Sequence, residues 1–287
     1  MAKSAAQMLM ERETRVSYGR APHALFGEVL AETGWQLRGD SFLLRGQGDH
    51  YFFYRVGHGV VIERGAAVDL SEERLWLYGS VYAAVASING LLPIHASAVA
   101  YEGRVFAFTG PAGAGKSTLV AALGARGMPM FCDDTLVLDL SEPDRVICLP
   151  GHKRLKLCPD AVDLTGATPQ ERVSLTVDKF YALPPAGEIH DVLPLEKLIF
   201  LERGSEPRIN PLSASDRFRC IQDDHQTSHL FAAARRFSRG EQFEHFGRLA
   251  KQIRMARFLR PMDKARFDEG VALAEQYVTH GASHVNN

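Results

Sequence analysis

The feature that most constrains this chain is the run Gly110-Pro-Ala-Gly-Ala-Gly-Lys-Ser117, which matches the pattern G-x-x-x-x-G-K-[ST] at every fixed position. Glycines let such a loop turn tightly, so that several backbone N–H groups point at phosphate oxygens, and a following helix adds the positive end of its dipole. The pattern therefore predicts a nucleoside triphosphate site, provided that a strand enters the loop and a helix leaves from Lys116.

The neighbouring residues predict both elements. Residues 104–109 form a β-branched and aromatic run typical of a buried strand, and residues 117–126 have apolar side chains at helical spacing up to Gly127. Lys116 would reach the β- and γ-phosphates of ATP, and the Ser117 hydroxyl would bind Mg²⁺. The predicted nucleotide-binding residues are Gly110, Pro111, Ala112, Gly113, Ala114, Gly115, Lys116, Ser117 and Thr118.

Composition limits the remaining classes of function. The 287 residues suffice for one large or two modest domains, and 46% hydrophobic residues can build a core. A net charge of -1 provides no overall field toward nucleic acid or anionic membranes, so we expect neither as a partner. The cysteines lack C-x-x-C spacing, which argues against a zinc site and a disulfide framework. We expect four reduced core thiols: Cys132, Cys148, Cys158 and Cys220.

The stretch 75–101 carries no Asp, Glu, Lys or Arg and is longer than the roughly 20 residues that a membrane-spanning helix needs. It is interrupted by residues that break helices, and Gly90 followed by Pro93 is a helix stop. We therefore interpret it as a buried helix followed by a strand. The N-terminus has too short an apolar run for a signal peptide, so we expect a cytoplasmic protein.

The fold class predicted from these patterns is α/β, a mixed sheet containing the phosphate loop. Residues 1–70 alternate short apolar runs with glycines and predict a β-rich accessory segment in the form of a meander. Residues 71–212 would form the core that contains the phosphate loop, opening with a helix over 71–88 that is capped by Ser71. Residues 213–287 would be helical, with helices over 215–237, 240–254 and from 261 or 264 to 280.

A histidine is predicted to lie beside the loop. The runs on either side of Glu102-Gly103 read as a β-hairpin with a two-residue turn. Because paired positions in a hairpin sum to a constant, Tyr101 opposite Arg104 places His95 opposite Gly110. An imidazole there could contact phosphate or orient a carboxylate, whereas the alternative is a satisfied core histidine.

Two carboxylates follow the next strand. Asp133 and Asp134 end an apolar run one helix after the loop, where a nucleotide site needs Mg²⁺ ligands and a base. Since successive strand side chains point to opposite faces, both can serve the site only if the strand ends or kinks there.

Farther on, Arg154 and Lys156 alternate with leucines, so one strand face is basic and could hold phosphate, an acidic substrate or only solvent.

The sequence resembles the bacterial HPr kinase/phosphorylase family, closely over residues 90–140. The resemblance lies in the order of four features along the chain: residues 95–99, the hairpin, the loop 110–118 and Cys132-Asp133-Asp134. Residues 149–161 and the helical C-terminal part resemble the shorter HPr-kinase-related proteins, some of which phosphorylate a lasso-peptide precursor on a serine. The resemblance implies that Asp133 takes the proton of the acceptor serine, that Asp134 binds Mg²⁺ or orients its neighbour, and that His95 supports the carboxylates or the phosphate.

The family's Glu-Ile-Arg-Gly signature, which is linked to the reverse phosphorolysis and to metal binding, has no match in this sequence. We therefore do not carry over phosphorolysis or HPr as the substrate, and the second metal ligand stays unassigned. The leading hypothesis is an ATP- and Mg²⁺-dependent serine kinase acting on a peptide or small protein. The alternatives are a small-metabolite kinase and a non-catalytic nucleotide sensor. The sequence identifies neither the adenine-binding residues nor the oligomeric state, and a homo-oligomer stays open.

Overall fold

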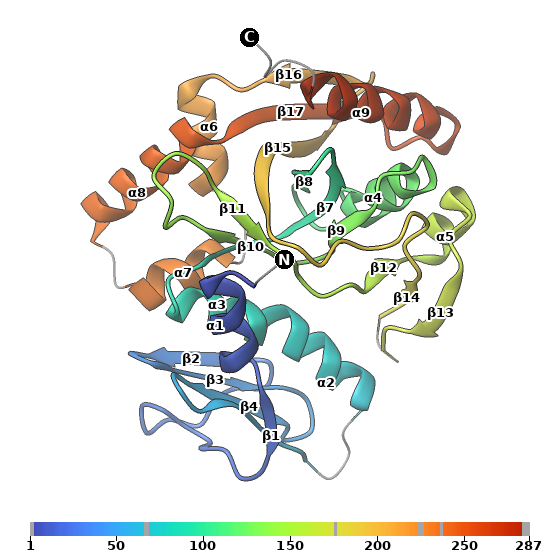
Figure 1. Ribbon diagram of the computed structural model, residues 1–287. Coiled ribbons are helices and arrows are strands. Elements are labelled where there is room, and N and C mark those ends of the chain that lie inside the picture. The colour runs from blue at the N-terminus through green and yellow to red at the C-terminus, as the bar shows by residue number, and fades with distance from the viewer. Residues whose placement is uncertain (1–2, 66–68, 175–176, 223–226, 236–237, 283–287) are drawn as a thin grey trace.

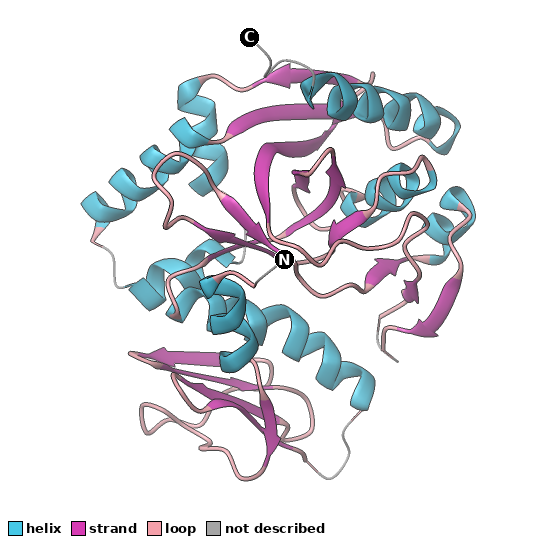
Figure 2. Ribbon diagram, in the orientation of Figure 1, coloured by secondary structure: helices cyan, strands magenta, loops and turns pink. Residues whose placement is uncertain are grey.

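The computed structural model describes residues 3–65, 69–174, 177–222, 227–235 and 238–282, and it has a mixed α/β fold (Figures 1 and 2). A small N-terminal sheet lies on one side of a long helical segment, and the main sheet with its flanking helices lies on the other (Figure 1). No helix of the described part of the chain is long and apolar enough to cross a membrane.

The N-terminal part begins with helix α1 (Ala5–Glu13), which the sequence analysis did not predict. Its start is fixed by a capping box between Ser4 and Gln7, and this S-x-x-Q pattern is a signal that the sequence offered. The sheet order is β1-β5-β4-β3-β2, in which β2 to β5 form the expected antiparallel meander and β1 pairs parallel with β5. The strands are β1 (Val16–Tyr18), β2 (Trp35–Arg38), β3 (Ser41–Arg45), β4 (Tyr51–Arg55) and β5 (Gly59–Glu63).

The helix expected over 71–88 is formed by α2 (Leu70–Trp76), a π-helical turn η1 (Leu77–Val81) and α3 (Tyr82–Ile88). Its N-cap is Asp69, whose carboxylate accepts a hydrogen bond from the Ser71 N–H, so the predicted cap at Ser71 was wrong by two residues. The buried residues of η1 and α3 share a core with strands β3 to β5. Strands follow from Leu92 onward, which confirms that the uncharged stretch is a helix and then strands.

The main sheet has the order β6-β10-β11-β15-β8-β7-β9, and β17 joins β15 to β16. Strands β8, β15 and β17 run parallel to one another, whereas the other pairs are antiparallel. The strands are β6 (Leu92–Ile94), β7 (Ala96–Tyr101), β8 (Arg104–Thr109), β9 (Met130–Cys132), β10 (Leu136–Asp139), β11 (Ile147–Leu149), β15 (Leu193–Arg203), β16 (Arg208–Pro211) and β17 (Arg254–Arg260).

The predicted hairpin is confirmed in turn and register. Tyr101 pairs with Arg104 and Ala96 with Thr109, as the constant sum requires. Glu102 and Gly103 have φ values of 47° and 72°, the positive values that a two-residue type I′ turn needs at both central positions. His95, one residue before β7, consequently lies at the end of the sheet where β8 enters the phosphate loop.

Helices cover both faces of the main sheet. On one face, α4 (Lys116–Ala125), α5 (Pro159–Thr165) and α9 (Phe267–Ala282) share a core with β8 and β17. On the other face lie α6 (Ala214–Gln222), α7 (Thr227–Arg235) and α8 (Arg239–Gln252). Beside α4 and α5 is a small sheet of the order β12-β14-β13, formed by β12 (Leu155–Leu157), β13 (Pro169–Arg172) and β14 (Phe180–Ala182).

The C-terminal part differs from the sequence expectation in one element. Strand β17 pairs along its whole length with the parallel strand β15, where only helices were expected. The helix predicted over 215–237 is described as α6 and α7, and its residues 223–226 and 236–237 lie outside the described residues. The 3₁₀ turn η2 (Lys264–Arg266) then leads from β17 into α9.

Candidate functional site

The predicted phosphate loop, residues 110–117, connects β8 to α4, as its pattern requires. Three of its glycines have positive φ, at 142° for Gly110, 77° for Gly113 and 78° for Gly115. A Cβ on Gly110 would lie 2.7 Å from the carbonyl oxygen of Leu201 on β15, so only glycine fits where the loop leaves the sheet. Helix α4 starts at Lys116, and its free N–H groups and dipole therefore face the loop.

Lys116 is only 7% exposed and folds back over the loop. Its Nζ donates hydrogen bonds to the carbonyl oxygens of Gly110 and Pro111, at 2.8 and 3.2 Å. A buried ammonium group is costly unless it is hydrogen-bonded or paired. The position of Lys116 thus holds a positive charge at the mouth of the loop, where an anionic ligand would gain most from it.

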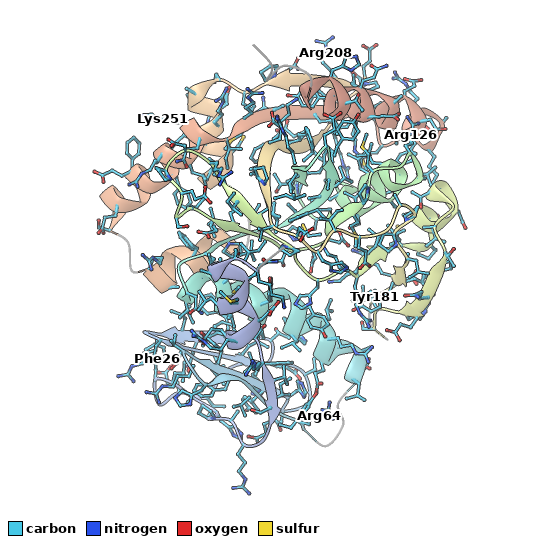
Figure 3. All side chains as sticks on the ribbon, in the orientation of Figure 1. Phe26, Arg64, Arg126, Tyr181, Arg208 and Lys251 are labelled. Carbon is cyan, nitrogen blue, oxygen red and sulfur yellow. The ribbon has the colours of Figure 1, made fainter. Side chains whose placement is uncertain are left out.

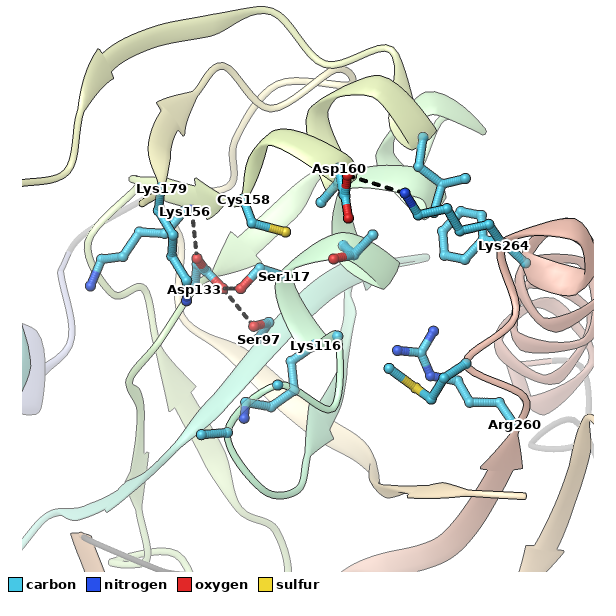
Figure 4. A pocket seen from close by; sticks show the side chains of 18 of the residues that line it. Ser97, Lys116, Ser117, Asp133, Lys156, Cys158, Asp160, Lys179, Arg260 and Lys264 are labelled. Atoms are coloured by element: carbon cyan, nitrogen blue, oxygen red, sulfur yellow. Dashed lines mark hydrogen bonds and ion pairs between the residues drawn. The ribbon is translucent and has the colours of Figure 1, made fainter. Parts of the chain in front are cut away.

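Asp133 is buried and receives hydrogen bonds on both oxygens (Figure 4). Its Oδ1 accepts from the hydroxyls of Ser97 and Ser117, at 2.5 and 2.8 Å, and its Oδ2 accepts from the Lys156 N–H at 2.9 Å. Ser97 comes from β7, Ser117 from α4 and Lys156 from β12. The carboxylate therefore joins three elements at the start of α4.

Asp134 points to the same site because the chain kinks beside it. Its φ is 74°, a value that a residue with a side chain rarely adopts, and the bend separates β9 from β10. The condition under which both aspartates can serve one site is therefore met. Such strain of about 1 kcal/mol or more is maintained by its surroundings and is common at functional sites.

The Asp134 carboxylate is paired with a lysine. Lys156 Nζ lies 2.8 Å from Asp134 Oδ2. Burial alone would raise the pKa of Asp134, but the attraction of Lys156 outweighs it and holds the pKa below its usual value. Burial would likewise lower the pKa of Lys156, and Asp134 raises it above the ordinary lysine value. Both groups therefore stay charged at neutral pH.

His95 is held against the same kink. Its Nδ1 lies 2.9 Å from the backbone oxygen of Asp134 and 3.6 Å from Oδ1 of that residue, and its own carbonyl accepts a hydrogen bond from the Thr109 hydroxyl. Burial, followed by the charge of Lys116, lowers the pKa of His95. At neutral pH the ring is therefore mostly neutral, and Nδ1–H donates to the Asp134 backbone oxygen. Of the two roles predicted for His95, this contact fits orientation of a carboxylate.

Most of the predicted residues line one cavity of about 520 Å³. The predicted residues that line it are His95, Ala112, Gly113, Gly115, Lys116, Ser117, Thr118, Asp133 and Asp134. Gly110, Pro111 and Ala114 belong to the loop but lie behind this lining. One wall of the cavity is formed by α5, and another by the turn from β17 to α9, where Lys264 pairs with Asp160 at 3.1 Å.

The cavity has further lining residues that the sequence analysis missed or ranked low, among them Ser97, Lys156, Cys158 and Arg260. Ser97 had a signal, because it lies two residues after His95 in the predicted hairpin strand, where alternate residues face the same side. Lys156 was noted as part of a basic face but ranked below the aspartates. Cys158 is exposed at the N-cap of α5, so its prediction as a core thiol was wrong. Arg260 had no signal, because β17 itself was not predicted.

The residues present fit a magnesium ion that takes most of its ligands from a nucleotide and from water. Among the described residues there is no group of three or more His, Cys, Asp and Glu side chains that could hold a metal. The oxygen atoms of Ser117, Asp133 and Asp134 nevertheless line the cavity next to the loop. Mg²⁺ prefers oxygen ligands and is commonly bound by one or two carboxylates with substrate phosphates.

Comparison with known proteins adds little to this geometry. No family model matches the sequence, and no curated protein matches it. Among solved structures, the HPr(Ser) kinase/phosphatase from Coxiella burnetii is similar, with 15% sequence identity and a TM-score of 0.37 over 68% of this chain and 99% of that chain. At that score the likeness carries no argument about the site, which therefore rests on its own residues.

Proposed function

We propose that this chain is an ATP- and Mg²⁺-dependent kinase that transfers the γ-phosphoryl group to a serine of a peptide or small protein. The observation that carries the proposal is the shared cavity, which Lys116 and Ser117 line together with Asp133 and Asp134. A phosphate loop and carboxylates facing one space are what phosphoryl transfer to a hydroxyl group needs, namely positioning, charge neutralisation and a proton acceptor.

In the proposed reaction the serine oxygen forms a bond to the γ-phosphorus, and the bond from the γ-phosphorus to the bridging oxygen of ADP breaks. The serine proton passes to Asp133. Lys116 stabilises the charge on the phosphate oxygens. His95 contributes by holding the backbone at Asp134, so its effect on the reaction is on positioning.

Mg²⁺ would be held by Ser117 and Asp134 and, when bound, would neutralise charge on the nucleotide phosphates. The Ser117 hydroxyl contacts Asp133 and not Asp134. Asp133 can therefore share the role of Mg²⁺ ligand that is assigned to Asp134. Asp133→Asn and Asp134→Asn must accordingly be compared for the Mg²⁺ concentration that each requires.

A peptide acceptor is favoured over a small metabolite by the charges beside Asp134. Lys156 and the exposed Lys179 line the cavity on the aspartate side (Figure 4). The guanidinium of Arg154 lies 4.8 Å from the ring of Tyr181, a residue of the small sheet (Figure 3), and pairs with Glu171 at 2.7 Å. The exposed Lys179 suits an acceptor chain with acidic residues near its serine. The candidate acceptor that we propose is a lasso-peptide precursor.

The proposal is tested by incubating the pure protein with γ-labelled ATP, Mg²⁺ and a panel of acceptors: HPr, a lasso precursor ending in serine, and free serine. We expect label on the serine of the precursor, and its loss in Asp133→Asn. Label on free serine alone would select the metabolite kinase. ATP binding with no transfer to any acceptor would contradict a kinase and select the nucleotide sensor.

A further inference from the structure

Arg260 is a buried cation of the cavity to which the proposed function assigns no task. It is the last residue of β17, it lines the cavity, and it is only 6% exposed. Its Nε is buried without a hydrogen-bond partner, and no ion pair joins the guanidinium to a carboxylate within the described ranges. A buried guanidinium without a counter-charge is costly, so its position is explained best by a ligand that supplies the charge.

The guanidinium lies directly on the phosphate loop. Its terminal nitrogen Nη2 donates a hydrogen bond to the carbonyl oxygen of Ala114. A Cβ added to Gly115 would overlap with the same nitrogen, so the side chain occupies the space that the missing Cβ leaves open. Arg260 thus lies against the loop and at the same time lines the cavity.

Arg260 lies at the opposite end of the cavity from the aspartates. In Figure 4, Asp133, Ser117 and Lys156 lie on one side of Lys116, whereas Arg260 lies on the other side, below Lys264. This second end is walled by apolar side chains, among them Leu164, Met262 and Phe267. Since the aspartate end serves the γ-phosphate in the proposed function, the Arg260 end is left for the rest of the nucleotide.

We propose that Arg260 binds the phosphate groups of a nucleoside diphosphate unit at the nucleoside end of the cavity, with the apolar wall of α5 and the β17–α9 turn covering the nucleoside. This inference rests on the proposed function in that the cavity binds a nucleotide. Guanidinium groups bind phosphate oxygens through two parallel N–H donors, which an ammonium group cannot reproduce. The role concerns binding, because Arg260 is remote from the carboxylates.

The test is the dissociation constant of ADP, measured by calorimetric titration of the full chain in Mg²⁺. For Arg260→Gln we expect this constant to rise by about tenfold or more, and for Arg260→Lys by a smaller factor, because a charge-assisted pair is lost or weakened. The matched control is Arg266→Gln. Arg266 lies six residues after Arg260, is half-buried, and pairs with Glu269. Its affinity for ADP should stay within about twofold of that of the unaltered chain.

A second measurement separates binding from folding. The melting temperature of ligand-free Arg260→Gln should equal or exceed that of the unaltered protein, because a buried and uncompensated charge is removed. A lower melting temperature with unchanged ADP affinity would overturn the inference and make Arg260 a structural support of the loop. If Arg260→Gln does not fold, the inference would equally be overturned by an ADP dissociation constant of Arg260→Lys equal to that of the unaltered protein.

The outcomes also distinguish this inference from the proposed function. Arg260-dependent ADP binding without transfer to any acceptor would uphold the inference and contradict the kinase. Transfer to serine with ADP affinity unaffected by Arg260→Gln would overturn the inference alone. Failure of the unaltered chain to bind ADP or ATP would overturn both.

Discussion

The Ser117 hydroxyl donates a 2.8 Å hydrogen bond to the carboxylate of Asp133 and thereby links the first turn of α4 to the end of β9. A serine in the first turn after a phosphate loop is suited to bind Mg²⁺, and a carboxylate beside it is suited to share that ion or to accept a proton. This contact connects the two parts of the candidate site.

Asp134→Asn tests the proposed metal role. The amide is a weaker Mg²⁺ ligand than the carboxylate, so we expect the Mg²⁺ concentration for half-maximal transfer to rise by about tenfold, with much of the activity regained at high Mg²⁺. Asp133→Asn should show no such recovery, because it removes the proton acceptor. The measurement is the transfer rate as a function of Mg²⁺. Recovery by Asp133→Asn in place of Asp134→Asn would exchange the two roles.

Gly115→Ala tests the packing of the loop. Gly115 has a φ of 78°, and a Cβ there would displace the end of the Arg260 side chain, so we expect the free energy of unfolding to fall by about 1 kcal/mol and nucleotide binding to be lost. The control is Gly127→Ala, at a φ of 92° with open space around the added Cβ, which should cost about 1 kcal/mol and leave binding intact. Equal effects of the two substitutions on nucleotide binding would contradict the close contact with Arg260.

Cys158 provides a chemical probe of the cavity. Its thiol is exposed and lines the space, whereas Cys132 and Cys148 are buried. ADP at ten times its dissociation constant should slow alkylation of Cys158 by about tenfold, because only the empty fraction reacts. Peptide mass spectrometry would follow the reaction, and Cys158→Ser identifies the modified site. An alkylation rate that is insensitive to ADP would show that the nucleotide binds elsewhere.

Part of this architecture could be predicted from the sequence, because it depends on short-range rules. The loop pattern fixes a strand, a turn and a helix, and the two-residue turn at Glu102 and Gly103 fixes the register that brings His95 to the loop. The requirement of a kink at the aspartates also followed from strand geometry, and Asp134 supplies it through its positive φ.

Other parts of the site depend on long-range pairing, which local patterns do not reveal. Arg260 reaches the loop only because β17 pairs parallel with β15, more than fifty residues earlier in the chain. Lys156 lay on a predicted strand, but its contact with Asp134 requires the small sheet to pack beside α4. Helix α1 was missed for a different reason, since its capping box at Ser4 and Gln7 was present in the sequence.

His152 predicts a pH dependence of stability. Its ring packs against Tyr78 and Tyr82, with centroids 3.9 and 4.8 Å away, and burial lowers its pKa to about 4. Below pH 6.5 the His152 imidazole binds a proton in the unfolded chain, whereas in the folded protein it stays neutral down to about pH 4. Stability should therefore fall by up to about 3 kcal/mol over this window as the pH decreases.

The check on His152 is urea denaturation between pH 7 and pH 4.5 for the unaltered chain and for His152→Phe. The phenylalanine keeps an aromatic ring between the tyrosines but does not titrate, so its stability should change less with pH. Parallel pH profiles for the two proteins would refute the assignment.

The most direct test of the account is the rate of γ-phosphoryl transfer from ATP to a serine-bearing peptide, compared among the unaltered chain, Lys116→Ala and Asp133→Asn. The account predicts that Asp133→Asn lowers this rate by about 10² to 10⁴ while ATP affinity stays within a few fold, and that Lys116→Ala impairs both. Transfer by either variant at the rate of the unaltered chain would contradict the assignment of the site.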